Sequence, residues 1–180
     1  MLGMRRSFCS VREGGKIDAG RSSGEMEKQG LIGQVKKDAT KKIAIALSAN
    51  KDHGKTSILK ALADIFRARK GVSLVDMQPM GTDVDEMWCF EKDGVQIGIA
   101  TGGDDANAID VAFDFFKKNA CRIVFCATRY YSNSPSWNQF VTRCDNEKYD
   151  ADWRGVDKHS PEVFEIMNKD VAENVLFKML

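Results

Sequence analysis

The segment Ala49-Asn50-Lys51-Asp52-His53-Gly54-Lys55-Thr56 decides how this chain of 180 residues is interpreted. The short apolar run of residues 43–47 precedes it and is typical of a fully buried strand. Residues 56–69 follow, with apolar side chains on one face, which predicts an amphipathic helix. A strand, a glycine-containing loop and a helix in this order indicate an α/β domain.

The segment fits the pattern Ala/Gly-x-x-x-x-Gly-Lys-Ser/Thr, and each fixed position has a physical reason. Backbone N–H groups of such a loop form a concave site for a phosphate, and the helix N-terminus adds partial positive charge. Gly54 lets the backbone approach where a Cβ would collide. Lys55 is expected to bridge the β- and γ-phosphates, and the Thr56 hydroxyl to join the shell of a Mg²⁺ ion.

These eight residues resemble the Walker A loop of P-loop NTPases. Ala49 stands where Gly is commoner, which the family tolerates, and Asn50 stands where partition-type ATPases carry a second lysine. The chain contains no Asn-Lys-x-Asp motif, so ATP is expected rather than GTP. The resemblance implies that ATP and Mg²⁺ are the cofactors, and that the residues binding them are Ala49, Asn50, Lys51, Asp52, His53, Gly54, Lys55, Thr56 and Ser57.

Strand and helix patterns alternate through the rest of the chain. Asp93-Gly94 lies between two apolar runs and is typical of a type I′ hairpin turn, which needs positive φ at both positions. Further strands are expected at residues 72–75, 87–90, 95–100 and 121–128, helices at 104–118 and 161–179, and a loop with a short helix at 130–149. We therefore expect a three-layer α/β P-loop fold with a mainly parallel sheet and one antiparallel hairpin.

Composition divides the chain near residue 42. Residues 1–42 hold 10 basic and 5 acidic residues and seven of the fifteen glycines, with little apolar periodicity. We expect residues 1–41 to be a flexible basic arm and residues 42–180 to be the nucleotide-binding domain. We expect the arm to have no core of its own, and a start of translation at Met26 would remove its first 25 residues. Docking on nucleic acid or on a protein partner is the functional alternative for the arm.

An acidic ligand for Mg²⁺ is expected where a buried strand ends near the loop. Asp104 is the first candidate, with Thr56, and Asp76 is the second; Asp105 and Asp83 are next. Helix capping is the alternative role for Asp104, and positioning of an acceptor hydroxyl in a small-molecule kinase is the alternative for Asp76.

The expected catalytic residues are Lys55, Asp104, Asp76 and Arg129. Arg129 is included because it follows the apolar run of residues 121–128, at the strand end where α/β proteins bind ligands. It would contact phosphate or acceptor there, and a surface salt bridge is its alternative.

Composition narrows the classes of function. The net charge is +1, and the apolar runs are far shorter than the ~20 residues that span a bilayer, so neither a membrane nor, outside the arm, nucleic acid is an expected partner. The five cysteines form no Cys-x-x-Cys pair, as in a cytoplasmic protein with reduced thiols. The expected activity is Mg²⁺-dependent ATP hydrolysis or phosphoryl transfer to an unknown acceptor. The alternative is a nucleotide-dependent switch or assembly factor that binds a protein partner in its ATP state.

Overall fold

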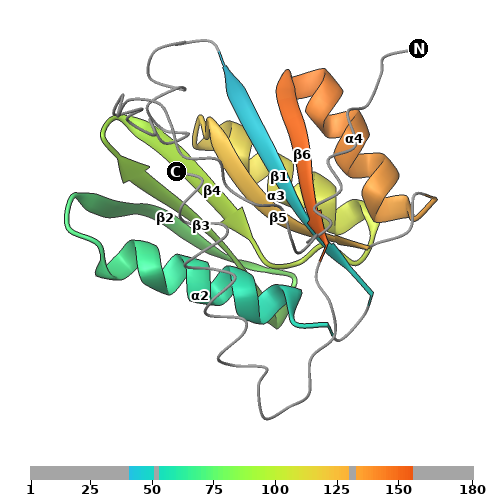
Figure 1. Cartoon of the computed structure of the whole chain (residues 1–180), viewed down its shortest axis with the longest axis horizontal. Coiled ribbons are helices and arrows are strands. Elements are labelled where there is room, and N and C mark those ends of the chain that lie inside the picture. The colour runs from blue at the N-terminus through green and yellow to red at the C-terminus, as the bar shows by residue number, and fades with distance from the viewer. Residues whose placement is uncertain (1–40, 51–52, 130–132, 156–180) are drawn as a thin grey trace, which may run out of the picture.

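The computed structural model describes residues 41–50, 53–129 and 133–155 (Figure 1). Its elements in chain order are β1 (Lys42–Ala49), α2 (Lys55–Ala68), β2 (Val72–Met80), β3 (Thr82–Lys92), β4 (Val95–Ala100), α3 (Ala106–Lys118), β5 (Ile123–Arg129), α4 (Pro135–Glu147) and β6 (Tyr149–Gly155). The basic arm up to residue 40, Lys51, Asp52 and the helix expected at residues 161–179 lie outside the described residues.

The six strands form one mixed sheet in the order β2-β3-β4-β5-β1-β6. β4, β5, β1 and β6 run parallel, whereas β2 pairs antiparallel with β3 and β3 pairs antiparallel with β4. The expectation of a three-layer P-loop fold with a mainly parallel sheet is therefore wrong. The physical reason is that the chain turns back twice without a helical crossover, so a three-stranded antiparallel unit takes up one side of the sheet.

Two tight turns produce this antiparallel unit. The Asp93-Gly94 turn joins β3 to β4, and its two residues have φ values of 55° and 79°, as a type I′ turn requires. Gly81, with φ of 69°, joins β2 to β3, and β2 extends to Met80 instead of ending near residue 75. An apolar run that reads as a parallel strand from its sequence is thus the outer strand of a meander.

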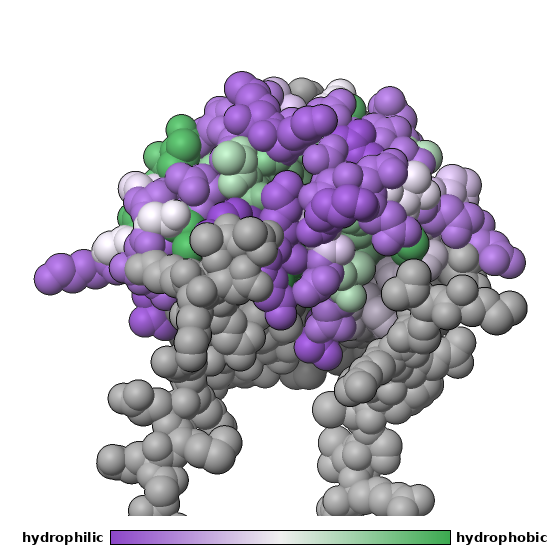
Figure 2. Space-filling view, turned by 90° about the horizontal axis from the view of Figure 1, so that it is seen from above, coloured by the Kyte–Doolittle hydropathy of each residue, from purple (hydrophilic) through white to green (hydrophobic). Residues whose placement is uncertain are grey.

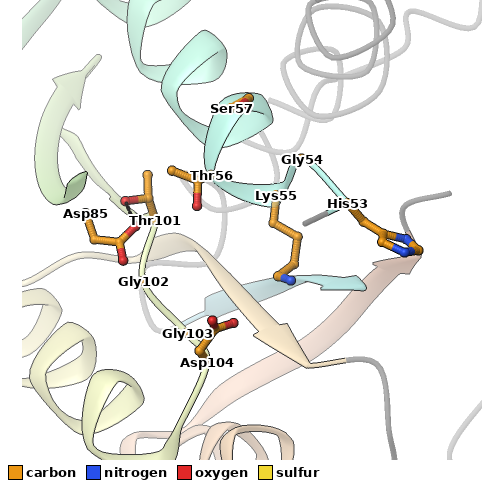
Figure 3. A pocket seen from close by; sticks show the side chains of 10 residues that line it. All are labelled: His53, Gly54, Lys55, Thr56, Ser57, Asp85, Thr101, Gly102, Gly103 and Asp104. Atoms are coloured by element: carbon orange, nitrogen blue, oxygen red, sulfur yellow. Dashed lines mark hydrogen bonds between the residues drawn. The ribbon is translucent and has the colours of Figure 1, made fainter. Parts of the chain in front are cut away.

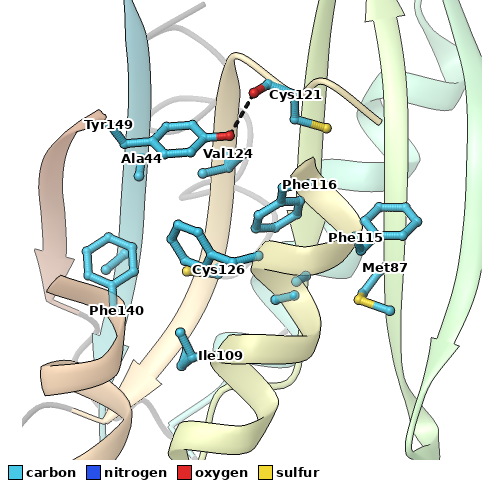
Figure 4. Packing of buried hydrophobic residues seen from close by; sticks show 14 of the residues in the cluster. Ala44, Met87, Ile109, Phe115, Phe116, Cys121, Val124, Cys126, Phe140 and Tyr149 are labelled. Carbon is cyan, nitrogen blue, oxygen red and sulfur yellow. Dashed lines mark hydrogen bonds between the residues drawn. The ribbon is translucent and has the colours of Figure 1, made fainter. Parts of the chain in front are cut away.

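Helices cover both faces of the sheet and bury two separate clusters. On one face α2 packs Ile58, Leu59, Leu62 and Phe66 against the sheet, where Phe66 stacks on Phe90 at 5.2 Å between ring centroids. On the other face α3 and α4 bury an aromatic group of Phe113, Phe116, Phe140 and Tyr149, the last three of which are labelled in Figure 4. Successive side chains of a strand point to opposite faces of the sheet. β1 therefore contributes Ile45 and Leu47 to one cluster and Ala44 and Ala46 to the other.

The last two described elements differ most from the sequence expectation. The expected loop with a short helix at residues 130–149 contains α4, a helix of 13 residues. Ser134 caps it by accepting from the Trp137 N–H, and Pro135 stands at its first position, where a missing N–H costs nothing. β6 follows and pairs in parallel with β1. The strand β1, which leads into the loop at residues 49–56, therefore has β5 on one side and β6 on the other.

The surface is mainly polar where it is visible. In Figure 2 hydrophilic residues dominate the described part of this face, and apolar residues are scattered among them. Among the described residues, no helix has the length and apolar character needed to cross a membrane.

Candidate functional site

A cavity of about 330 Å³ lies at the edge of the sheet where β1, β4 and β5 end (Figure 3). Two segments and one strand residue line it: His53, Gly54, Lys55, Thr56 and Ser57 at the start of α2, Thr101, Gly102, Gly103 and Asp104 after β4, and Asp85 in β3. The carboxyl ends of parallel strands are where open α/β sheets bind ligands. The loop and the first acidic candidate predicted from the sequence therefore face the same space.

The N-terminus of α2 opens into this cavity. Gly54 is the residue before the helix and has a left-handed φ of 86°. Its carbonyl oxygen accepts a hydrogen bond from the Ile58 N–H at 2.9 Å, which begins the first turn of α2. In the part of the chain that the structure describes, no side chain caps the helix. The first N–H groups of a helix have no partner inside it, so this end suits an anion.

Lys55 is the first residue of α2, and its side chain is buried, with 7% exposed. The ammonium donates to the carbonyl oxygens of Ala49, at 3.1 Å, and Asn50, at 2.9 Å. These bonds hold the charge across the mouth of the loop, and in Figure 3 the ammonium points into the space beside Asp104. A lysine held in this way is placed to meet a phosphate bound at the helix N-terminus.

The remaining residues of the loop are distributed around the same end. Thr56 and Ser57 line the cavity in the first turn of α2, and His53 lines its far side (Figure 3). Ala49 ends β1 and is buried, and Asn50 contributes its carbonyl to Lys55. Lys51 and Asp52 were predicted to bind the nucleotide too, and they lie outside the described residues.

Asp104 and Asp105 have different partners. Asp105 is the N-cap of α3 and accepts from the Ala108 N–H at 2.8 Å. The Asp104 carboxylate lines the cavity and forms an ion pair with Arg129 at 2.8 Å. The helix-capping role that is the alternative for Asp104 thus belongs to Asp105.

Arg129 is held through its backbone by three serines. Its N–H donates to the Ser136 hydroxyl at 3.1 Å, and its carbonyl accepts from the hydroxyls of Ser48, at 3.2 Å, and Ser134, at 3.4 Å. All three serines are buried. The end of β5 is therefore fixed to β1 and to the start of α4, and the Arg129 side chain extends from a backbone that is held in place.

Asp85 is the pocket residue that sequence reasoning missed. The Thr101 hydroxyl donates to Asp85 Oδ1 at 3.0 Å and accepts from the Glu86 N–H at 2.9 Å. Thr101 is 2% exposed, so this arrangement orients the Asp85 carboxylate from below. The only signal in the sequence is the acidic stretch of residues 83–86, which gives no register; Asp83 itself lies in β3, and its side chain is not described.

The structure does not bring Asp76 to the cavity. Its carboxylate oxygen Oδ2 accepts from Asn119 Nδ2 and Lys118 Nζ, each at 3.1 Å, and from Gln78 Nε2 at 3.2 Å. The bonds from Asn119 and Lys118 lower the pKa of this carboxyl. Asp76 thus joins the outer strand β2 to the end of α3 and does not line the pocket with Lys55.

The glycines after β4 have a packing reason. A Cβ on Gly103 would lie far inside van der Waals contact with the carbonyl group of Ala127 in β5, and one on Gly102 would lie 2.8 Å from Met80 Sδ. The turn that carries Asp104 therefore lies directly against β5, and this close packing sets the position of the Asp104 carboxylate at the pocket.

Comparisons with family models, with curated proteins and with solved structures find no match to this chain. The assignment of the pocket therefore depends on the chemistry of its own residues.

Proposed function

We propose that the chain binds ATP with Mg²⁺ in the cavity at the start of α2, as the resemblance of its loop to P-loop NTPases suggests, and that it hydrolyses ATP or transfers its γ-phosphoryl group. The observation that carries the proposal is the convergence of a helix N-terminus, the Lys55 ammonium and two carboxylates on one cavity. The proposal depends on the loop and this pocket, and not on the order of the strands.

Phosphate binding is the best supported step. The N–H groups of the first turn and the Lys55 ammonium offer one positive region to the β- and γ-phosphates. Lys55 would exchange its bonds to the Ala49 and Asn50 carbonyls for phosphate oxygens. A cavity of about 330 Å³ is at the small end of the range for ligand sites, which suits a triphosphate whose nucleoside lies outside it.

The donor set fits Mg²⁺. The Thr56 hydroxyl and the Asp104 carboxylate are hard oxygen ligands that line the same cavity, and Mg²⁺ in nucleotide sites uses one or two such groups with phosphates and water. Among the described residues, no group of three or more His, Cys, Asp or Glu side chains could hold a metal, so the phosphates would supply the remaining ligands. The bound ion would neutralise charge on the phosphates during transfer.

The other pocket residues have separate tasks in the proposal. The Thr101 hydroxyl holds Oδ1 of Asp85, which leaves Oδ2 to orient an attacking water or an acceptor hydroxyl. Arg129 would leave Asp104 when Asp104 binds the metal, and its guanidinium would then stabilise charge on the transferred phosphoryl group. The absence of a guanine-reading motif favours ATP, and the lack of a Cys-x-x-Cys pair among the five cysteines favours a cytoplasmic protein with reduced thiols.

Calorimetric titration with Mg²⁺ and ATP tests the proposal. Lys55→Ala should weaken binding tenfold to a hundredfold, since a charged hydrogen bond contributes about 1.5–3 kcal/mol. Lys60→Ala is the matched control, because Lys60 lies one and a half turns along the same helix and pairs with Glu86 at 3.6 Å, outside the pocket lining. Equal affinities of Lys55→Ala and the parent chain would refute the nucleotide site, and a tenfold preference for GTP would refute the choice of ATP alone.

The alternative function, a nucleotide-dependent switch that binds a protein partner, is favoured by one observation. The outer strand β2 exposes three large apolar side chains, Leu74, Val75 and Met77, each close to half exposed. Such a group at a sheet edge is a typical contact surface. ADP production that depends on an added small-molecule acceptor would favour a kinase. Capture of a partner in ATP but not in ADP, lost on Val75→Lys, would favour the switch.

A further inference from the structure

Two buried cysteines outside the nucleotide pocket lie in direct contact. The Cys121 thiol donates to the Cys89 sulfur, with the two Sγ atoms 3.7 Å apart. Cys89 is in β3 and Cys121 lies between α3 and β5, 32 positions later in the chain. Neither side chain has a role in the proposed nucleotide chemistry.

A glycine makes this contact possible. Gly98 of β4 lies opposite Cys89 in the sheet, and a Cβ at that position would lie 3.1 Å from Cys121 Sγ and would overlap the Phe116 ring. Because Gly98 has no side chain, Cys121 reaches across β4 toward Cys89. The carbonyl of Cys121 accepts from the Tyr149 hydroxyl at 2.7 Å, which fixes the segment that carries the thiol (Figure 4).

The two thiols are not chemically equivalent. The hydrogen bond from Cys121 lowers the pKa of the Cys89 thiol, whereas the same bond, together with burial, raises the pKa of the Cys121 thiol. The hydrogen bond from Cys121 therefore favours the thiolate form of Cys89, which is the form that attacks an oxidant.

Both thiols are buried, with Cys89 0% and Cys121 1% exposed, so an oxidant reaches them only when the sheet next to them opens locally. Asp76 is paired with Cys89 across β2 and β3, and the register shifts between Leu74 and Asp76. Such a bulge leaves one residue of the outer strand without a ladder partner, and outer strands open locally more easily than central ones. A peroxide is small enough to reach the thiols through such an opening.

We infer that Cys89 and Cys121 are a reversible disulfide pair that a peroxide oxidises. The Cys89 thiolate attacks one oxygen of hydrogen peroxide, so that an S–O bond forms, the O–O bond breaks and the leaving hydroxide takes up the proton that Cys89 released, to become water. The Cys121 sulfur then attacks Cys89, so that the S–S bond forms, the S–O bond breaks and the second hydroxide leaves as water with the Cys121 proton. Two thiols lose two electrons, and the peroxide is reduced to two waters.

The pair is assigned to disulfide chemistry rather than to a metal. Among the described residues, Cys89 and Cys121 belong to no group of three or more possible metal ligands. The bond needs the sulfurs to move from 3.7 Å to about 2.0 Å, and rotation of the two side chains has to supply this movement, because the Tyr149 hydrogen bond holds the Cys121 backbone. It would join β3 to the start of β5, at the opposite end of β5 from Arg129.

The experiment treats the full chain carrying Cys9→Ser with limiting hydrogen peroxide and measures the intact mass. We expect a loss of about 2 Da, reversed by a dithiol, with a peptide that links Cys89 to Cys121. Cys126→Ser with Cys144→Ser is the matched control, since both of these thiols are buried on the same face, and it should still lose the same mass. Cys89→Ser and Cys121→Ser should each abolish the loss.

Folding of each variant is checked by circular dichroism, and Cys89→Ala replaces Cys89→Ser if the serine chain is unfolded. A linked peptide that contains Cys126 or Cys144, a mass loss that appears only in denaturant, or no mass loss in the folded control would each overturn the assignment. Binding of ATP by the oxidised chain should change less than twofold, and an unchanged mass with intact ATP binding would reject the disulfide without touching the nucleotide site.

Discussion

The Arg129 guanidinium and the Asp104 carboxylate form an ion pair, with Nη2 and Oδ2 2.8 Å apart, that joins the end of β5 to the turn after β4. Asp104 is about half exposed and Arg129 less than a third, so the pair is wet and contributes less than about 1 kcal/mol to stability. Its main consequence is positional, because the pair ties Asp104, which lines the cavity, to Arg129 at the end of β5, which lies beside the lining residues.

Asp104→Asn should slow ATP turnover on the order of a hundredfold, because a neutral amide is a much weaker ligand for Mg²⁺ than a carboxylate. Asp105→Asn is a matched control one residue away, since Asn is as good an N-cap as Asp and α3 should keep its stability. Steady-state rates across a Mg²⁺ titration measure the difference. Normal turnover of Asp104→Asn at low Mg²⁺ would remove Asp104 from the metal site.

Asp85→Asn should lower kcat with little change in the KM for ATP, because the proposal gives this carboxylate an attacking water or hydroxyl and no phosphate to bind. Thr101→Val should have a smaller effect in the same direction, since it removes the hydrogen bond that orients Asp85 and leaves the charge in place. Thr101→Ser keeps the hydroxyl and should restore most of the rate. A raised KM with normal kcat in Asp85→Asn would assign it to nucleotide or metal binding instead.

The local elements could be predicted from the sequence wherever a strong local signal exists. The apolar run before Ala49, the one-sided stripe of α2 and the Asp93-Gly94 turn each depend on neighbouring residues, and the structure has a strand, a helix and a hairpin there. Strand direction depends on where the chain goes after a turn. Gly81 turns β2 back onto β3, and nothing in residues 72–80 distinguishes that path from a parallel crossover.

The candidate site was predictable where a local strand or helix pattern places its residues, as for the loop before α2 and for Asp104 after β4. Gly54, Lys55 and Thr56 meet the cavity because they follow one another at a helix start. Asp85 reaches the same cavity through the antiparallel pairing of β3 with β4, which the sequence does not specify. Asp76 was expected near the loop because it would follow a strand parallel to β1. In the structure it lies within the edge strand β2, and Asn119 and Lys118 bind its carboxylate.

Gly103→Ala should destabilise the fold by roughly 1–3 kcal/mol, the usual cost of forcing extra volume into a packed position. The added Cβ would meet the Ala127 carbonyl, which is backbone of a central strand and cannot rotate away. Gly155→Ala is the control, because a Cβ there lies 3.6 Å from the Trp153 ring, an ordinary contact. Urea unfolding measures both variants, and equal midpoints would show that the turn after β4 has room to move.

Asp76→Asn should change the acid stability of the protein and leave ATP turnover unchanged. The bonds from Asn119 and Lys118 hold the folded pKa of Asp76 below its unfolded value, so they stabilise the folded chain fully above a pH of about 4. This contribution is lost as the pH falls through the lower, folded pKa.

The free energy of unfolding of the parent chain should therefore fall more steeply than that of Asp76→Asn below a pH of about 4, and the two curves should run parallel at neutral pH. Asp64→Asn is the control, because Asp64 pairs with Arg67 within α2 and its side chain is 71% exposed. Urea midpoints measured from neutral pH down to about 2 test this prediction. Curves for Asp76→Asn and the parent chain that stay parallel throughout would show that the Asp76 contacts do not depend on its charge. A loss of turnover in Asp76→Asn would return this residue to the catalytic candidates.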